Sequence, residues 1–144
     1  MTTWDDAASW YLKMVGDSDT GFNDLAADIA VELLGQCQGK AVLDLGCGEG
    51  HVARRLARSG AKVVGVDPTK PLLDFARAAE SKQPLGIDFR LEAAEHLRSL
   101  DDSSLDAVVS VLALHHVKDL RVALSEVHRV LRPGGRFCVV IPHP

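Results

Sequence analysis

Residues 42–51 read VLDLGCGEGH, and the glycines Gly46, Gly48 and Gly50 alternate directly after an apolar run. Glycine has no Cβ, so it permits a positive φ and lets another group approach the backbone closely. Two kinds of ligand fit such a turn. One is a pyrophosphate, as in dinucleotide folds, and the other is a nucleoside without phosphate that carries an amino acid on its ribose. The rest of the chain decides between them.

Short apolar runs alternate with helical patterns along most of the chain. The runs are AVLDL (41–45), KVVGV (62–66), IDFRL (87–91), DAVVSVL (106–112) and RFCVVI (136–141). Three of them are almost continuously apolar, which is typical of strands that helices cover on both faces. Alternation of this kind predicts right-handed βαβ units and a doubly wound parallel sheet. The fold class is therefore α/β.

Two helices show clear apolar stripes. In the helix that precedes the first strand, Asn23 is the expected N-cap and the expected buried side chains are Leu25, Ile29, Leu33 and Leu34. In the helix before the last strand, Asp119 is the expected N-cap and the expected buried side chains are Leu120, Leu124, Val127 and Leu131.

Length and composition predict one soluble domain. The chain has 144 residues and a net charge of -4, from 16 basic and 20 acidic residues, so it carries no electrostatic signal for nucleic acid. The N-terminus lacks the apolar core of a secretory signal, and no run of residues is long enough to span a membrane. The three cysteines and the six histidines show no metal-ligand spacing, so no metal site is expected. A cytoplasmic protein is expected.

The glycine loop departs from the dinucleotide fingerprint. G-x-G-x-x-G requires a glycine or alanine where this chain has His51, and the pattern here is G-x-G-x-G. No G-K-[ST] follows, which excludes a P-loop. Asp67 stands 21 residues after Gly46, at the end of the second strand, where a carboxylate accepts hydrogen bonds from a ribose diol. A plain turn before Pro68 is the alternative for Asp67. The functional alternative requires Asp67 and Gly48 to face each other across one crevice.

At this point the sequence resembles the class I S-adenosylmethionine-dependent methyltransferases of the broad small-molecule type. The resemblance runs from about Trp4 to the end of the chain. It rests on three stretches in order: VLDLGCGEGHVARRLARSGAKVVGVDPT (42–69), LDAVVSVLALHHVKD (105–119) and EVHRVLRPGGRFCVV (126–140). The resemblance implies a Rossmann-like sheet in the order 3-2-1-4-5, S-adenosylmethionine as cofactor, and one domain over residues 1–144 whose helices in 1–35 cover the cofactor.

The resemblance also implies roles for individual residues. Asp44, Gly46, Cys47 and Gly48 would line the methionine and ribose part of the cofactor. Asp67 would hold the ribose hydroxyls, with Pro68 against the adenine. Val111 and Leu112 would close the methionyl side, and Tyr11 would cover the cofactor from the first helix.

One position departs from the family pattern. The acidic residue that commonly bonds the adenine amino group is replaced by Ala93. Backbone atoms of Ala94 and Glu95, or the side chain of Glu92, would then contact the adenine instead.

Methyl transfer is an in-line displacement at an activated carbon, so the protein mainly aligns the acceptor and excludes water. His115 and His116 follow the fourth strand near the acceptor, and they are expected to pack or to hold the loop rather than to act as a base. No catalytic residue is assigned. Cys47 is expected to be a small packing residue.

The chain ends at VVIPHP, and the resemblance implies that the family's last two strands are absent from it. The fifth strand would then be a bare apolar edge. Either the chain is a fragment of a longer protein or this edge pairs with another copy, and we predict self-association through residues 136–141. The main prediction for function is methyl transfer to a small-molecule acceptor. A truncated or degenerate cofactor-binding module without turnover is the alternative, and an NAD-dependent oxidoreductase is disfavoured by His51.

Overall fold

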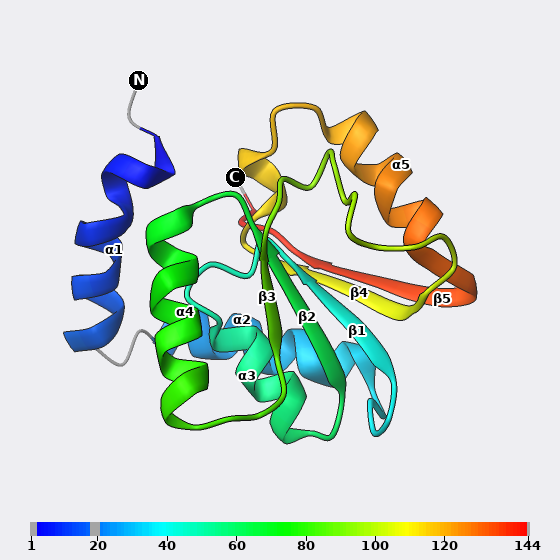
Figure 1. Cartoon of the computed structure of the whole chain (residues 1–144), viewed down its shortest axis with the longest axis horizontal. Coiled ribbons are helices and arrows are strands. Elements are labelled where there is room, and N and C mark those ends of the chain that lie inside the picture. The colour runs from blue at the N-terminus through cyan, green and yellow to red at the C-terminus, as the bar shows by residue number, and fades with distance from the viewer. Residues whose placement is uncertain (1–2, 18–20, 144) are drawn as a thin grey trace.

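A computed structural model describes residues 3–17 and 21–143 (Figure 1). Its elements, in chain order, are α1 (Trp4–Asp17), α2 (Gly21–Leu34), β1 (Ala41–Leu45), α3 (His51–Arg58), β2 (Lys62–Asp67), α4 (Lys70–Lys82), β3 (Asp88–Leu91), β4 (Leu105–Val111), the 3-10 helix η1 (Leu114–His116), α5 (Leu120–Val130) and β5 (Leu131–Val140).

The five strands form one sheet in the order β3-β2-β1-β4-β5, and every neighbouring pair is parallel. This confirms the predicted fold class and strand order. β5 begins at Leu131 rather than at Arg136, because Leu131 already pairs with Leu105 of β4. The next pair joins Arg136 to Ala107, so the Pro-Gly-Gly segment between them forms an irregularity in the strand. Pro133 has no amide donor, so regular pairing with β4 resumes only at Arg136.

The sheet has a hydrophobic cluster on each face. Val42 of β1 packs in the cluster that contains α2, α3 and α4, while its neighbour Leu43 packs in the cluster that contains α5. Side chains alternate between the faces of a strand, so two apolar neighbours require cover on both sides. Continuous apolar runs in β1 and β4 therefore predicted the layers correctly.

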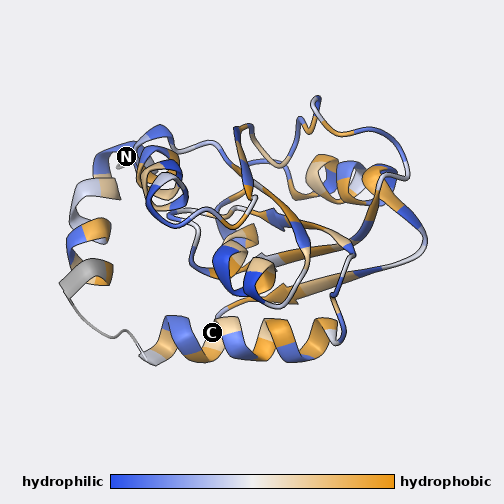
Figure 2. Cartoon of the chain, turned by 60° about the horizontal axis from the view of Figure 1, so that its bottom comes forward, coloured by the Kyte–Doolittle hydropathy of each residue, from blue (hydrophilic) through white to orange (hydrophobic). Residues whose placement is uncertain are grey.

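The predicted buried stripe of α2 is wrong. Leu34 is buried, but Leu25 and Leu33 are 57% and 61% exposed, and Ile29 and Phe22 are also exposed. The residues that face the sheet are instead Ala26, Ala27, Ala30 and Leu34. Small side chains let this helix lie close to β4 and β5, which it contacts. We call the exposed set Phe22, Leu25, Ile29 and Leu33 the α2 stripe; Figure 2 shows hydrophobic residues along this helix, at the bottom of the view.

The N-terminus of α2 and the apolar face of α5 also differ from expectation. α2 begins at Gly21, so Asn23 lies inside the helix and is not its cap. Asp119 does cap α5, because its Oδ1 accepts a hydrogen bond of 3.1 Å from the Val122 amide. The buried residues of α5 are Ala123, Val127 and Val130, while Leu120 and Leu124 are exposed.

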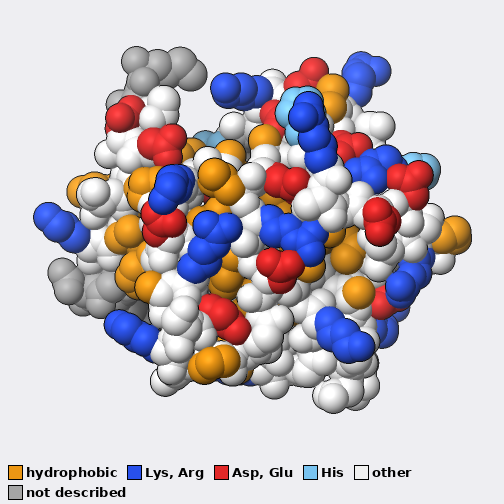
Figure 3. Space-filling view, viewed as in Figure 1, with side chains coloured by type: hydrophobic (Ala, Val, Ile, Leu, Met, Phe, Trp, Pro, Cys, Tyr) orange, Lys and Arg blue, Asp and Glu red, His pale blue; other side chains and the backbone are white. Residues whose placement is uncertain are grey.

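Acidic and basic side chains are interspersed on the face shown in Figure 3, with no block of one sign. Among the helices in the described part of the chain, none has both the length and the apolarity that a membrane span needs.

Candidate functional site

A cavity of about 780 Å³ lies at the carboxyl ends of β1, β2 and β4. Its volume is within the range of small-molecule and cofactor sites. It also lies where ligands of doubly wound sheets bind, beyond the strand ends at the point where the winding reverses. Every predicted site residue lines this one cavity: Tyr11, Asp44, Gly46, Cys47, Gly48, Asp67, Pro68, Ala94, Glu95, Val111 and Leu112.

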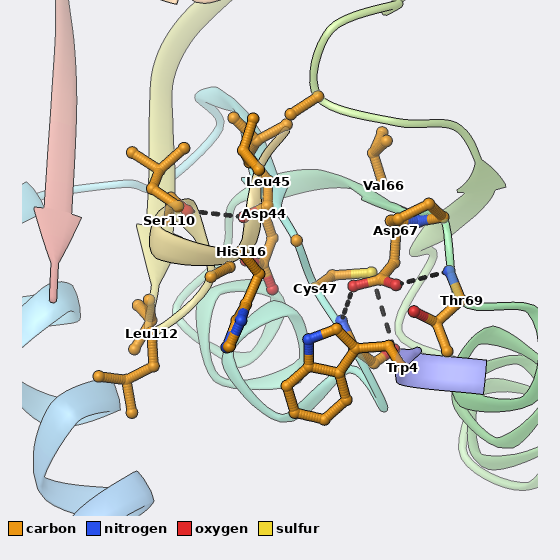
Figure 4. A pocket seen from close by; sticks show the side chains of 18 of the residues that line it. Trp4, Asp44, Leu45, Cys47, Val66, Asp67, Thr69, Ser110, Leu112 and His116 are labelled. Atoms are coloured by element: carbon orange, nitrogen blue, oxygen red, sulfur yellow. Dashed lines mark hydrogen bonds between the residues drawn. The ribbon is translucent and has the colours of Figure 1, made fainter. Parts of the chain in front are cut away.

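Asp67 binds the glycine loop directly. Its Oδ2 accepts a hydrogen bond of 2.9 Å from the Gly48 amide, and its Oδ1 accepts one of 2.8 Å from the Thr69 amide (Figure 4). The two groups therefore share one cavity wall rather than facing each other across a gap. A carboxylate offers about four lone-pair sites, so both oxygens keep capacity for a ligand.

Glycine is favoured at positions 46, 48 and 50 for different structural reasons. All three have positive φ, from 53° at Gly48 to 89° at Gly50. A Cβ at Gly46 would lie 2.4 Å from the Ala113 Cβ, and one at Gly50 would lie 2.9 Å from the Phe89 ring. At Gly48 the nearest atom would be a Leu72 methyl 3.8 Å away. Close approach at Gly46 and Gly50 is thus to the protein's own side chains, and the cavity itself leaves room beside Gly48.

Gly46→Ala is expected to destabilise the protein by about 1–3 kcal/mol more than Gly48→Ala, because both introduce an unfavourable φ but only Gly46→Ala also overpacks against Ala113. Urea unfolding of the two variants measures the difference. Equal stability of the two would show that the β1 and β4 loops are not in close contact.

Asp44 places a buried carboxyl group in the cavity wall. It is only 1% exposed, and within the described residues its Oδ2 has no hydrogen-bond partner. Burial raises the pKa of the Asp44 carboxyl to about 8, and the nearby charges of Asp67 and Glu49 add to the shift. A buried polar atom without a partner is rare in proteins and indicates a missing ligand or water. Because the environment disfavours another negative charge, the arrangement favours a hydrogen-bond donor or a cation.

Two other loop residues have structural roles. The Glu49 carboxylate is buried and forms an ion pair of 3.0 Å with Arg54 on the next turn. Burial raises the pKa of the Cys47 thiol well above its ordinary value, so the thiol is protonated at neutral pH. Cys47 therefore packs as a small neutral residue, as expected, because a thiol nucleophile needs a lowered pKa.

The end of β4 forms the second wall. Ser110 is fully buried and donates a hydrogen bond of 2.9 Å to the Leu45 carbonyl, which ties β4 to β1 below the cavity. Leu112 has a φ of 54°, which a leucine rarely adopts, and its amide donates to the Val140 carbonyl at 2.7 Å. Backbone strain of this kind concentrates at functional sites. No sequence signal marked it, because leucine gives no indication of a left-handed position.

The residues after β3 form the third wall. Both Glu92 oxygens bind Ser99, at 3.0 Å to its amide and 2.8 Å to its hydroxyl. Glu95 Oε1 accepts from the Lys118 and Asp119 amides before α5. The side chains of Glu92 and Glu95 thus hold loops, while Ala93 and Ala94 have no polar side-chain atoms at the cavity.

α1 and the start of α2 close the cavity on the remaining side. The Trp4 ring makes edge contacts with Tyr11 and with His116, at centroid distances of 5.6 and 5.1 Å. Burial raises the pKa of the Tyr11 hydroxyl, and a hydrogen bond with the Asn23 side chain opposes the shift. Burial and the neighbouring His115 lower the pKa of His116, and the two imidazoles pack at 3.8 Å. The Trp4–His116 contact joins residues that are far apart in the sequence, and no local pattern could have predicted it.

Within residues 3–17 and 21–143, no group of three or more His, Cys, Asp or Glu side chains is arranged to hold a metal ion.

The sequence of this chain matches a family model described as a methyltransferase domain over residues 43–139. The chain therefore belongs to the class I S-adenosylmethionine-dependent methyltransferase family. The predicted family is confirmed, and the NAD-dependent alternative is set aside.

Similar proteins include a ubiquinone biosynthesis O-methyltransferase of Alkalilimnicola ehrlichii, which is 35% identical over 113 residues (78% of this chain and 46% of that protein). An uncharacterized methyltransferase of Mycobacterium tuberculosis is 44% identical over 111 residues, covering 77% of this chain and 43% of that protein. The chain thus spans about half the length of the curated relatives that it matches.

Among solved structures, a putative methyltransferase in a complex with the Haloferax volcanii Trm112 methyltransferase activator aligns with a TM-score of 0.81. The two chains are 28% identical, and the match covers 96% of this chain and 60% of that one.

Proposed function

We propose that this chain binds S-adenosylmethionine in the cavity and belongs to an enzyme that transfers the methyl group to a small-molecule acceptor. The observation that carries this proposal is the Asp44 carboxylate, buried and without a partner for Oδ2, beside Asp67 at the glycine loop. S-adenosylmethionine has a cationic ammonium group and a cationic sulfur but no phosphate. A pyrophosphate would bring negative charge toward Asp44 and Asp67, which is unfavourable at short range.

The proposed cofactor contacts follow from the groups that remain available. Asp44 would pair with the ammonium group, and the lone pairs that Asp67 keeps would accept from the ribose hydroxyls. Gly46, Cys47 and Gly48 would lie along the methionine and ribose. Because both Glu92 oxygens bind Ser99, we favour the backbone of Ala94 and Glu95 over the Glu92 side chain for the adenine contact.

The remaining proposed contacts lie on the other walls. Pro68 would lie against the adenine, and Val111 and Leu112 would bound the methionyl part. Tyr11 would cover the cofactor from α1, so the helices in residues 1–35 would form its lid.

The cofactor supplies a methyl group that is already activated on a cationic sulfur. The chain's own contribution is then to align the acceptor and to exclude water. Trp4, Phe22 and His116 line the α1 side of the cavity and would bound the acceptor. The small-molecule class of acceptor is supported by this partly aromatic wall and by the net charge of -4, which gives no electrostatic attraction for a nucleic acid. A cytoplasmic location remains a prediction.

Calorimetric titration with S-adenosylhomocysteine tests the proposal most directly. We expect saturable binding with one site per chain, and no binding of NADH. Binding of NADH with no heat from S-adenosylhomocysteine would contradict it. The alternative of a binding module without turnover is not favoured by the family assignment. A panel of phenols, amines and carboxylic acids incubated with labelled S-adenosylmethionine separates the two, because only an enzyme transfers the label.

A further inference from the structure

Three residues on the α1 side of the cavity have no part in the proposed cofactor contacts. These are Trp4, Phe22 and His116, and Figure 4 shows the Trp4 and His116 rings side by side. Asp44 and Asp67 line the same cavity. A second molecule bound at the α1 side would therefore share the cavity with a cofactor held by these carboxylates.

The position of His116 is fixed relative to the glycine loop. The strained backbone at Leu112 leads directly into η1, and Leu114 of η1 is buried in the cluster that contains α5. Between them, Ala113 lies so close to Gly46 that a Cβ on the glycine would be 2.4 Å from the alanine Cβ. Backbone strain concentrates at sites that hold ligands. These contacts set η1, and with it His116, at a defined place beside the proposed cofactor.

The hydrogen bonds that hold the loop after η1 come from Glu95 and not from the two histidines. Glu95 Oε1 accepts from the Lys118 and Asp119 amides at 3.0 and 3.2 Å. Within the described residues, neither the His115 nor the His116 imidazole forms a hydrogen bond, although both make ring contacts. The histidines therefore pack, as expected, and their nitrogens remain available to a ligand.

The His116 imidazole can accept a hydrogen bond at neutral pH. Burial and the neighbouring His115 hold its pKa below the usual 6.5, so the ring is mostly neutral. One nitrogen of a neutral imidazole carries a proton and the other accepts a hydrogen bond. A ligand that suits this nitrogen needs a donor group.

The charges around the cavity select among the groups that can receive a methyl group. Burial raises the pKa values of Asp44 and Tyr11, and the charges of Asp67 and Glu49 raise both further. A carboxylate acceptor would add another negative charge at this place. An aliphatic amine, with a pKa of about 10, is an ammonium ion at neutral pH and has no lone pair to receive the methyl group. A hydroxyl group is neutral and supplies the donor.

The aromatic side chains on the same side of the cavity favour a ring as the body of the acceptor. The Trp4 ring already makes edge contacts with Tyr11 and His116, and Phe22, the first residue of the α2 stripe, lines the cavity near α1. Aromatic rings gain more from contact with one another than their buried area alone provides. A hydroxyl group on an aromatic ring would therefore suit both Trp4 and His116.

We propose that the α1 side of the cavity binds the methyl acceptor and that this acceptor is a phenol, with its ring against Trp4 and its hydroxyl donating a hydrogen bond to His116. The inference rests on the proposed function, to which it adds the class of acceptor and the two side chains that recognise it.

Competition between phenol and its methyl ether tests the role of His116. In the chain saturated with S-adenosylhomocysteine, NMR titration measures the affinity for phenol and for anisole, which has the same ring but no donor. The wild type should prefer phenol by roughly two- to tenfold, the usual range for one hydrogen bond. His116→Phe keeps a ring beside Trp4 but has no acceptor, so the preference should disappear. The matched control is His128→Phe, at an exposed position on α5 that does not line the cavity, and it should keep the preference.

Trp4→Ala tests the contact with the ring. Phenol and anisole should both lose roughly two- to tenfold in affinity, while the preference between them stays. Trp10→Ala is the matched control, because Trp10 lies on the same helix, is 66% exposed and does not line the cavity. It should change neither affinity. Benzoate and benzylamine, with the same ring but a charged group, should bind the wild type more weakly than phenol.

The outcomes separate this inference from the proposed function. No binding of S-adenosylhomocysteine would overturn both. If S-adenosylhomocysteine binds, the acceptor class alone is overturned by any of three results: equal affinity for phenol and anisole, a preference that survives His116→Phe, or tighter binding of benzoate or benzylamine than of phenol. Unchanged affinity in Trp4→Ala, or an equal loss in Trp10→Ala, would overturn the assignment of Trp4.

Discussion

Asp67→Ala is expected to weaken S-adenosylhomocysteine binding by about 3 kcal/mol, roughly a hundredfold. Two effects combine. The variant removes the proposed acceptor for the ribose hydroxyls, and it releases the Gly48 and Thr69 amides that Asp67 now holds at 2.9 and 2.8 Å. Hydrogen bonds to charged groups contribute about 1.5–3 kcal/mol each, so the loss of more than one produces an effect of this size. Isothermal titration calorimetry measures it directly.

Asp106→Ala is the matched control for this prediction. Asp106 lies at the start of β4, at the opposite end of the sheet, and its Oδ2 accepts a hydrogen bond of 2.8 Å from the Ala41 amide. Its loss should lower stability without changing ligand affinity. If Asp67→Ala bound the ligand as tightly as the wild type, or if Asp106→Ala lost as much affinity, Asp67 would be a turn residue only.

Asp44→Asn is expected to lower affinity for S-adenosylhomocysteine by about 2–5 kcal/mol, because removing one partner of a buried charge pair leaves the other uncompensated. Burial raises the pKa of Asp44 to about 8, so the carboxyl is mostly protonated at neutral pH. Pairing with a cation requires the ionised form. Binding should therefore release a proton, and wild-type affinity should rise as pH increases toward about 8. Titrations in buffers of different ionisation enthalpy measure the released proton, which Asp44→Asn should abolish.

The same pKa makes a prediction for the protein without ligand. The folded pKa of Asp44 lies above its ordinary value of 3.8, so the folded state binds this proton more tightly than the unfolded state. The associated stability is fully present below about pH 4 and is lost as pH rises through about 8. Asp44→Asn should therefore become more stable relative to wild type over that range, as thermal unfolding at several pH values will show. Asp101→Asn, at an exposed position in a loop, controls for the loss of one surface charge. An equal trend in both variants would exclude Asp44 as the source.

Most of the fold could be predicted because its signals are local. The apolar runs of β1 and β4 are long enough to require cover on both faces, and the alternation with helices then restricts the sheet to a parallel, doubly wound order. The glycine loop and Asp67 stand at the ends of adjacent strands, β1 and β2, and parallel strands bring such ends to one edge. Residues 67 and 48 could therefore be placed together without any coordinates.

The faces of α2 could not be predicted by the same means. This helix has two apolar faces, one of alanines and one of larger side chains, and hydropathy alone favours burying the larger. Packing favoured the alanines, because a helix that lies close to the sheet needs small residues in between. For α5 the helix ends one residue before Leu131, which enters β5, and the buried face turns toward Ala123 and Val130.

By itself, the sequence determined the α/β class, because period and turn chemistry carry that information along the chain. Its resemblance to the methyltransferases, carried by three stretches in order, supplied the family, the strand order and the set of residues that line one cavity. Only the tertiary structure decided which groups each of those residues contacts. Ala113 and Phe89 lie beside Gly46 and Gly50. The Asp44 carboxyl is buried, and within the described residues its Oδ2 has no hydrogen-bond partner. The Trp4 ring contacts His116. Such contacts depend on distances between segments far apart in the chain, and local preferences are the same whether or not those segments meet.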